Sequence, residues 1–216
     1  MEQFDAIKRL FTIKEAKGYS VEEVYKAKGL YGGIPFVLEQ FYLQLGRSDE
    51  LLCLQDELIL PGRWPALIND THLVFFNENQ GCCQAGIDLN DIEKEDPPVY
   101  VGYEFTDWIK TSDTISGFLI AMFGYQAACW GLRFAFDGIT ILSKSDLGVI
   151  QQHFTKQPDT LENWWNLKID LYASNPDERI AVLYLDDDQM QMLYAANNQL
   201  TFEAMQRVLK DVGTPL

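Results

Sequence analysis

The stretch that most constrains the fold is Leu73–Leu89, LVFFNENQGCCQAGIDL. An apolar run leads into the polar segment NENQG, and a second β-rich run leaves it. Asn79 and Gly81 tolerate the positive φ angles that a chain reversal requires. Two short β-rich runs around such a segment predict a β-hairpin whose loop is longer than a two-residue turn.

The remaining patterns mix helices and strands. Ser20 and Glu23 have the spacing of a helix capping box, and Thr201 is the predicted N-cap of the last helix. Helices are expected over residues 4–16, 20–29, 35–45, 111–130, 143–154 and 201–213. Strands are expected over residues 50–60, 99–104, 131–138, 167–174 and 178–196, the last as a hairpin around Asp186–Asp188. Without regular βαβ alternation, this order predicts an α+β fold. The 216 residues predict a single domain, 1–216, with an N-terminal helical lead and a C-terminal hairpin and helix.

The charge of the chain narrows the class of partner. The formal net charge is −15. Phosphate backbones and anionic membranes repel such a surface, so we expect neither nucleic acid nor a membrane as a partner. A basic protein is the partner that this field would attract. The alternative is that the acidic surface only keeps the protein in solution.

Cysteine and histidine usage gives no sign of a metal or redox site. Four cysteines stand at 53, 82, 83 and 129, without a CxxC motif, and the chain has two histidines. We therefore predict no metal, no cofactor and no disulfide framework. Cys82 and Cys83 are interpreted as small buried strand residues, because no base in a recognisable catalytic signature is available to activate a thiol. The amphipathic, acidic N-terminus and the lack of a long apolar run predict a cytoplasmic protein.

Catalytic motifs are missing as well. The sequence contains no GxGxxG, P-loop, GxSxG or HExxH pattern. No residues are therefore assigned a catalytic role, and we predict that the chain is not an enzyme. A hydrolase or deaminase that relies on His72, Cys83 or the acidic residues is the alternative, and it would need a second polar group within hydrogen-bond distance.

The order of several segments resembles a known family. The segments are GGIPFVLEQFYLQLG, LPGRWP, LVFFNENQGCCQAGI, DPPVYV, Trp108 and TISGFLIAMFGYQAA. This combination, over at least residues 33–128, resembles the SUKH superfamily and, within it, the cell-wall-assembly-regulator-like branch. The C-terminal LTFEAMQRVL is also similar to the end of many such chains. The chain departs from the pattern at Ala85, where an aromatic residue often stands, and in its long N-terminal lead.

The resemblance implies a fold and a function. The implied fold is α+β, with a central, mostly antiparallel sheet flanked by helices. Most bacterial members are implied to be cytoplasmic immunity proteins that block a cognate toxin domain, often a nuclease or deaminase. Eukaryotic and viral members act instead as interaction modules, so a regulatory module with an endogenous partner is the alternative. The oligomeric state stays open.

Candidate partner-binding residues lie on and after the hairpin. The hairpin loop supplies polar side chains, although such side chains also hydrogen-bond the turn backbone. The loop DLNDIEKEDPP is acidic and lacks the glycine and terminal glutamate of a calcium-binding EF-hand, so it is either a solvated loop or a docking surface for lysine and arginine. Trp108 is either an interface anchor or a lid on the core. The candidate residues are Glu78, Gln80, Asp88, Asp91, Glu93, Glu95, Asp96 and Trp108.

Overall fold

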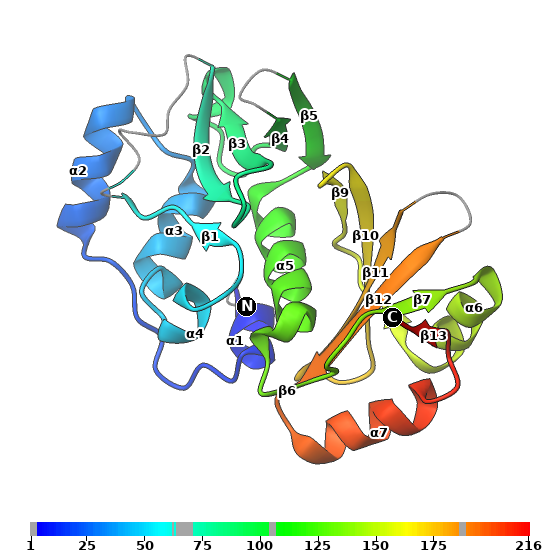
Figure 1. Ribbon diagram of the computed structural model, residues 1–216. Coiled ribbons are helices and arrows are strands. Elements are labelled where there is room, and N and C mark those ends of the chain that lie inside the picture. The colour runs from blue at the N-terminus through cyan, green and yellow to red at the C-terminus, as the bar shows by residue number, and fades with distance from the viewer. Residues whose placement is uncertain (1–3, 62, 64–70, 104–106, 186–188) are drawn as a thin grey trace. The chain divides into compact units, whose positions relative to one another are not determined.

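The computed structural model describes residues 4–61, 63, 71–103, 107–185 and 189–216 (Figure 1). Its contacts divide the chain into two compact units, which are described separately. Unit 1 comprises residues 1–12, 120–162 and 166–216, and unit 2 comprises residues 13–119 and 163–165. Two compact units of one chain can still fold in a single cooperative transition, so the single domain stays a prediction.

Unit 2 contains the predicted hairpin in a five-stranded antiparallel sheet of order β1-β2-β3-β4-β5. The strands are β1 (Glu57–Leu58), β2 (His72–Asn77), β3 (Gln84–Asp88), β4 (Val99–Tyr103) and β5 (Asp107–Ser112). The hairpin is confirmed, because β2 and β3 pair from His72 opposite Asp88 to Asn77 opposite Gln84. The edge strand β5 was not predicted from the sequence.

The helices of unit 2 follow the local sequence signals in part. They are α2 (Val21–Tyr31), α3 (Phe36–Leu45), α4 (Asp49–Leu52) and the first turns of α5 (Ile115–Gln126). The capping box is confirmed, because Ser20 Oγ accepts from the Glu23 N–H at 3.2 Å and Glu23 Oε2 accepts from the Ser20 N–H at 2.9 Å. The helix ends at Gly32, with φ 74°, and not at the predicted Gly29. The strand predicted over residues 50–60 was wrong in its first part, which forms α4.

The core of unit 2 is rich in aromatic rings. Phe118 of α5 makes edge contacts with Phe75 and Phe76 of β2, at ring-centroid distances of 5.4 and 6.0 Å. Trp164 comes from the short segment 163–165 and lies 6.2 Å from both Phe76 and Phe118. Trp164 is fully buried. A distant tripeptide therefore supplies the largest side chain of this core.

Unit 1 is built on a second antiparallel sheet, of order β13-β7-β12-β11-β10-β8, with β6 paired to β12 and β9 paired to β10. Its strands are β6 (Phe134–Ala135), β7 (Thr140–Leu142), β8 (Thr155–Lys156), the first half of β9 (Leu161–Trp164), β10 (Leu167–Ala173), β11 (Glu178–Tyr184), β12 (Met190–Ala196) and β13 (Thr214–Pro215). Its helices are α1 (Asp5–Leu10), the later turns of α5, α6 (Lys144–His153) and α7 (Gln199–Leu209). The α+β class is confirmed, although with two sheets in place of one central sheet.

The central strands of unit 1 are largely buried, and α6 and α7 cover one of their faces. Ile180, Val182 and Met192 belong to a cluster that includes Ile150 of α6 and Met205 of α7. The paired strands β11 and β12 confirm the predicted hairpin strands, with Tyr184 opposite Met190. The predicted turn at Asp186–Asp188 lies outside the described residues.

The predicted cap of the last helix was wrong. The N-cap of α7 is Asn198, whose side chain accepts from the backbone N–H groups of Leu200 and Thr201. Thr201 therefore lies inside the first turn. Asn and Thr are both good caps, and the choice between them depends on where the preceding strand ends.

Candidate protein-binding surface

Acidic side chains are concentrated in unit 2. This unit carries 18 acidic and 8 basic side chains, a net charge of −10, whereas unit 1 carries 14 and 9, a net charge of −5. Residues 88–113 alone contain eight acidic side chains and two lysines. The segment that begins at the end of β3 is therefore the most acidic part of the unit.

Two of the predicted acidic residues shape the loop itself. Asp88 Oδ1 accepts from the backbone N–H and from the side-chain amide of Asn90, both at 2.9 Å, and so caps a short 3-10 helix, Leu89–Asp91. Asp91 pairs with Lys94 at 2.7 Å. These two carboxylates stabilise the turn, and part of their charge is neutralised within it.

The end of the loop is fixed to two helices. Asp96 accepts from the backbone N–H of Ser116 at 3.0 Å and from the Ser116 hydroxyl, in the first turn of α5. A carboxylate at this position is favoured by the helix dipole. The carbonyl of Glu95 accepts from the backbone N–H of Val37, at the start of α3, at 3.1 Å. The loop backbone is therefore held in place by α3 and α5.

Two carboxylates remain available on this anchored loop. The side chains of Glu93 and Glu95 are exposed. Across the described part of the chain, neither carboxylate forms an ion pair or a hydrogen bond. A partner can therefore approach both groups without displacing an internal contact or ordering the backbone.

The two candidate binding residues of the hairpin loop, Glu78 and Gln80, differ in burial. Glu78 is 2% exposed, and its Oε2 accepts from the backbone N–H groups of Gln80 at 2.9 Å and Cys82 at 3.0 Å. Gly81 closes the turn at φ 75° and donates to the carbonyl of Glu78. Glu78 thus holds the loop from inside, whereas the side chain of Gln80 is exposed.

The adjacent cysteines differ in the same way. Cys83 is buried, and burial raises the pKa of its thiol to about 12, so the thiol stays protonated at neutral pH. Cys82 is exposed, which contradicts the interpretation of both residues as buried. The pair lies just before β3 and not within it.

Thiol labelling provides a first test of these placements. We expect the exposed Cys53 and Cys82 to react with a thiol reagent in the native protein, and the buried Cys83 and Cys129 to react only after unfolding. The number of thiols that react quickly, measured by absorbance with and without denaturant, checks this. Cys82→Ser should remove one fast thiol, and fast labelling of Cys83 would contradict the buried position.

Trp108 packs on the sheet as a cover for two glycines. An added Cβ at Gly86 or at Gly102 would lie 2.9 Å from atoms of the Trp108 ring. The ring stacks on His72, with centroids 4.0 Å apart and planes at 9°. Its Nε1 is buried and, within the described residues, has no hydrogen-bond partner. Trp108 therefore stabilises this face of the sheet in the free protein. Gly86 and Gly102 were not singled out from the sequence, although a glycine inside a strand can indicate that another group packs closely against its backbone.

His72 should make stability depend on pH. Burial lowers its pKa, while the charge of Asp88 opposes this shift. Protonation is therefore harder in the folded state, so the contribution of His72 to stability is present above about pH 6.5 and is lost as pH falls below that value. We expect the urea midpoint to fall between pH 7 and pH 5, and to fall less in His72→Gln. The exposed His153 gives a matched control, because His153→Gln should keep the wild-type pH dependence. Identical pH profiles for all three proteins would contradict this assignment.

The comparisons with known proteins add no relative. No protein-family model, no curated protein and no solved structure matches the chain. Among the residues that the structure describes, no group of three or more histidine, cysteine, aspartate or glutamate side chains is arranged to hold a metal ion. None of the described helices has the length and apolar character needed to cross a membrane.

Proposed function

We propose that this chain is an immunity protein that binds and neutralises a basic toxin domain acting on nucleic acid. The observation that carries the proposal is the pair of exposed carboxylates, Glu93 and Glu95, on a loop held by α3 and α5. The resemblance of residues 33–128 to SUKH proteins supports the same function.

The physical basis is competition for a positive surface. A domain that binds nucleic acid needs lysine and arginine in its cleft to hold phosphate groups. Carboxylates on an anchored loop offer negative charges, as phosphate groups do, and the loop backbone loses little conformational freedom on binding. The net charge of −10 on unit 2 would also steer a basic partner toward it and raise the association rate.

Co-expression tests the proposal directly. We expect the chain to restore the growth of cells that express a toxin encoded beside it, and to co-purify with that toxin. An inactive toxin variant, which needs no neutralisation, controls for expression and for binding. The proposal would be contradicted if cells that express the chain still stopped growing with each of the toxins encoded beside it. An endogenous partner recovered in place of a toxin would favour the regulatory module.

Charge reversal tests the loop itself. The double variant Glu93→Lys, Glu95→Lys should slow association about tenfold at low ionic strength, and much less at high ionic strength, because salt screens the steering field. Stopped-flow measurements at several salt concentrations check this. The matched control is Glu15→Lys, Glu50→Lys, which changes the charge of unit 2 equally at two other exposed positions. Equal slowing by both pairs would mean that net charge, and not this loop, governs association.

A further inference from the structure

Arg179 is a buried cation whose guanidinium, among the described residues, has no hydrogen-bond or ion-pair partner and feels only the nearby charge of Glu178. Its side chain lies in unit 1 and is 7% exposed. Nε is buried without a hydrogen-bond partner, and across the described residues the guanidinium forms no hydrogen bond or ion pair. Burying a charge is unfavourable unless an opposite charge or hydrogen bonds compensate it. The position therefore calls for an anionic partner.

Two neighbours of Arg179 explain why its charge is not compensated and how its side chain is accommodated. Arg179 follows Glu178 at the start of β11, but the Glu178 carboxylate is used by the turn before the strand, where it accepts from the backbone N–H groups of Ser174 and Asn175 at 2.6 and 3.1 Å. On the α5 side, a Cβ at Gly124 would lie 3.5 Å from the Nε of Arg179. The glycine thus leaves room for the stem of Arg179 beside α5.

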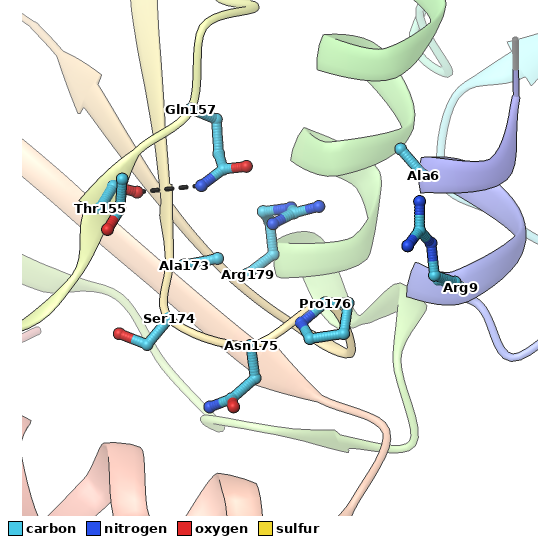
Figure 2. A pocket seen from close by; sticks show the side chains of 9 residues that line it. All are labelled: Ala6, Arg9, Thr155, Gln157, Ala173, Ser174, Asn175, Pro176 and Arg179. Carbon is cyan, nitrogen blue, oxygen red and sulfur yellow. Dashed lines mark hydrogen bonds between the residues drawn. The ribbon is translucent and has the colours of Figure 1, made fainter. Parts of the chain in front are cut away.

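Arg179 lines a pocket of about 330 Å³ within unit 1, which is in the range of small-ligand sites. Figure 2 shows its guanidinium directed toward α1, where Arg9 lies on the facing side of the pocket. No described lining residue is acidic. The polar lining residues are Arg9, Thr155, Gln157, Ser174, Asn175 and Arg179.

The second arginine is held in position by contacts of α1. The side-chain amide of Asn197, just after β12, donates to the carbonyl of Leu10. Phe11 makes an edge contact with Phe123 of α5, with centroids 6.3 Å apart. Arg9 itself donates from Nε to the carbonyl of Asp5 at 3.3 Å, which leaves its terminal N–H groups available. The pocket thus has two cationic sides, one from the sheet and one from α1.

The neutral side chains contribute fewer donors. The hydroxyl of Ser174 donates to the carbonyl of His153 at 2.7 Å, and the Asn175 amide donates to Glu178 at 3.1 Å. Gln157 donates one amide hydrogen to the carbonyl of Thr155 at 3.0 Å, as the dashed line in Figure 2 shows, and keeps its other amide hydrogen. Burial lowers the pKa of Arg179 to about 10, so its guanidinium remains charged at neutral pH.

We infer that this pocket binds the phosphate group of a small phosphorylated molecule, between the guanidinium groups of Arg179 and Arg9. A tetrahedral phosphate presents oxygens in several directions, so it can accept from two guanidinium groups on facing sides. A carboxylate offers only two oxygens in one plane and a single negative charge, so it fits two facing guanidinium groups less well. The inference goes beyond the proposed protein binding, because the pocket lies entirely in unit 1 and the acidic loop in unit 2.

Thermal unfolding in the presence of anions tests the inference on the full chain. Inorganic phosphate and glycerol 3-phosphate, each at about five times its Kd, should raise Tm by about 2–4 °C above sodium chloride of equal ionic strength. Acetate should give no such rise. No rise with phosphate above the chloride control, or an equal rise with acetate, would overturn the assignment.

Variants connect the effect to the two arginines. Arg179→Met keeps the apolar stem, and it should raise Tm without phosphate but lose the phosphate effect, because it removes a buried unpaired charge. Arg9→Gln, at an exposed position, should weaken phosphate binding about fivefold by calorimetry, which keeps the test decisive if Arg179→Met does not fold. Arg207→Gln, on the exposed face of α7, should bind phosphate as the wild type does. A full phosphate effect in either pocket variant would overturn the inference.

Discussion

Glu178→Ala is expected to lower the free energy of unfolding by about 3–5 kcal/mol. The carboxylate is 1% exposed and accepts three hydrogen bonds, from the backbone N–H groups of Ser174 and Asn175 and from the Asn175 side chain. Alanine would leave these donors in the turn before β11 without their acceptor. Each hydrogen bond to a charged acceptor contributes more than one between neutral groups. Urea unfolding measured by circular dichroism checks the value.

Two variants control for this effect. Glu178→Gln keeps one side-chain oxygen as an acceptor and should lose about half as much stability as the alanine variant. Glu203→Ala removes an exposed glutamate on α7 that accepts one hydrogen bond, from Gln199, and should change stability by less than about 0.5 kcal/mol. If Glu178→Ala and Glu203→Ala lose equally little stability, the turn does not depend on the buried carboxylate.

The second large effect is expected where Trp108 covers the sheet. Trp108→Ala should lower the free energy of unfolding by about 2–4 kcal/mol, because it removes the ring from Gly86, Gly102 and His72. Gly102→Ala should cost about 1–3 kcal/mol in the wild-type protein, because its Cβ would lie 2.9 Å from the ring. In the Trp108→Ala background the same glycine change should become neutral or stabilising, because alanine restricts the unfolded chain more than glycine does.

A double-mutant cycle on urea midpoints measures this reversal of sign. Gly29→Ala in α2 is the matched glycine control, because an added Cβ there meets no atom within 4 Å. It should stabilise the protein by about 0.5–1 kcal/mol. Additive effects of Trp108→Ala and Gly102→Ala would contradict the close packing of ring on glycine.

The sequence predicted those features that depend on neighbouring residues. The Ser20–Glu23 capping box joins residues of one helix turn, the β2–β3 hairpin joins two strands that follow each other in the sequence, and both are confirmed. The α+β class followed from the order of helix and strand patterns. The strand β5 escaped prediction because it is a sheet edge, where Asp107, Ile109 and Lys110 are exposed and no apolar alternation is needed.

The candidate site was predicted less completely, because burial depends on tertiary contacts. Composition marked the acidic loop, but only the structure separates Asp88, Asp91 and Asp96, which stabilise the loop, from Glu93 and Glu95, which make no polar contact with the described part of the chain. Glu78 looked like a recognition residue and instead lies inside its own turn. Arg179 had no distinguishing sequence signal, since an arginine within a strand pattern does not reveal which side of the sheet it enters. The binding function itself stays a prediction.

The path of the chain through residues 163–165 limits how the protein can be divided. These residues return to unit 2 from the middle of unit 1, and Asn163, Trp165 and Asn166 all adopt positive φ angles as the chain enters and leaves. A fragment truncated after residue 119 would therefore lack the indole that Phe76 and Phe118 enclose. Neither unit is a continuous stretch of chain that could be excised by itself. Deleting this tripeptide would remove the largest fully buried side chain from a core whose other residues end at position 119.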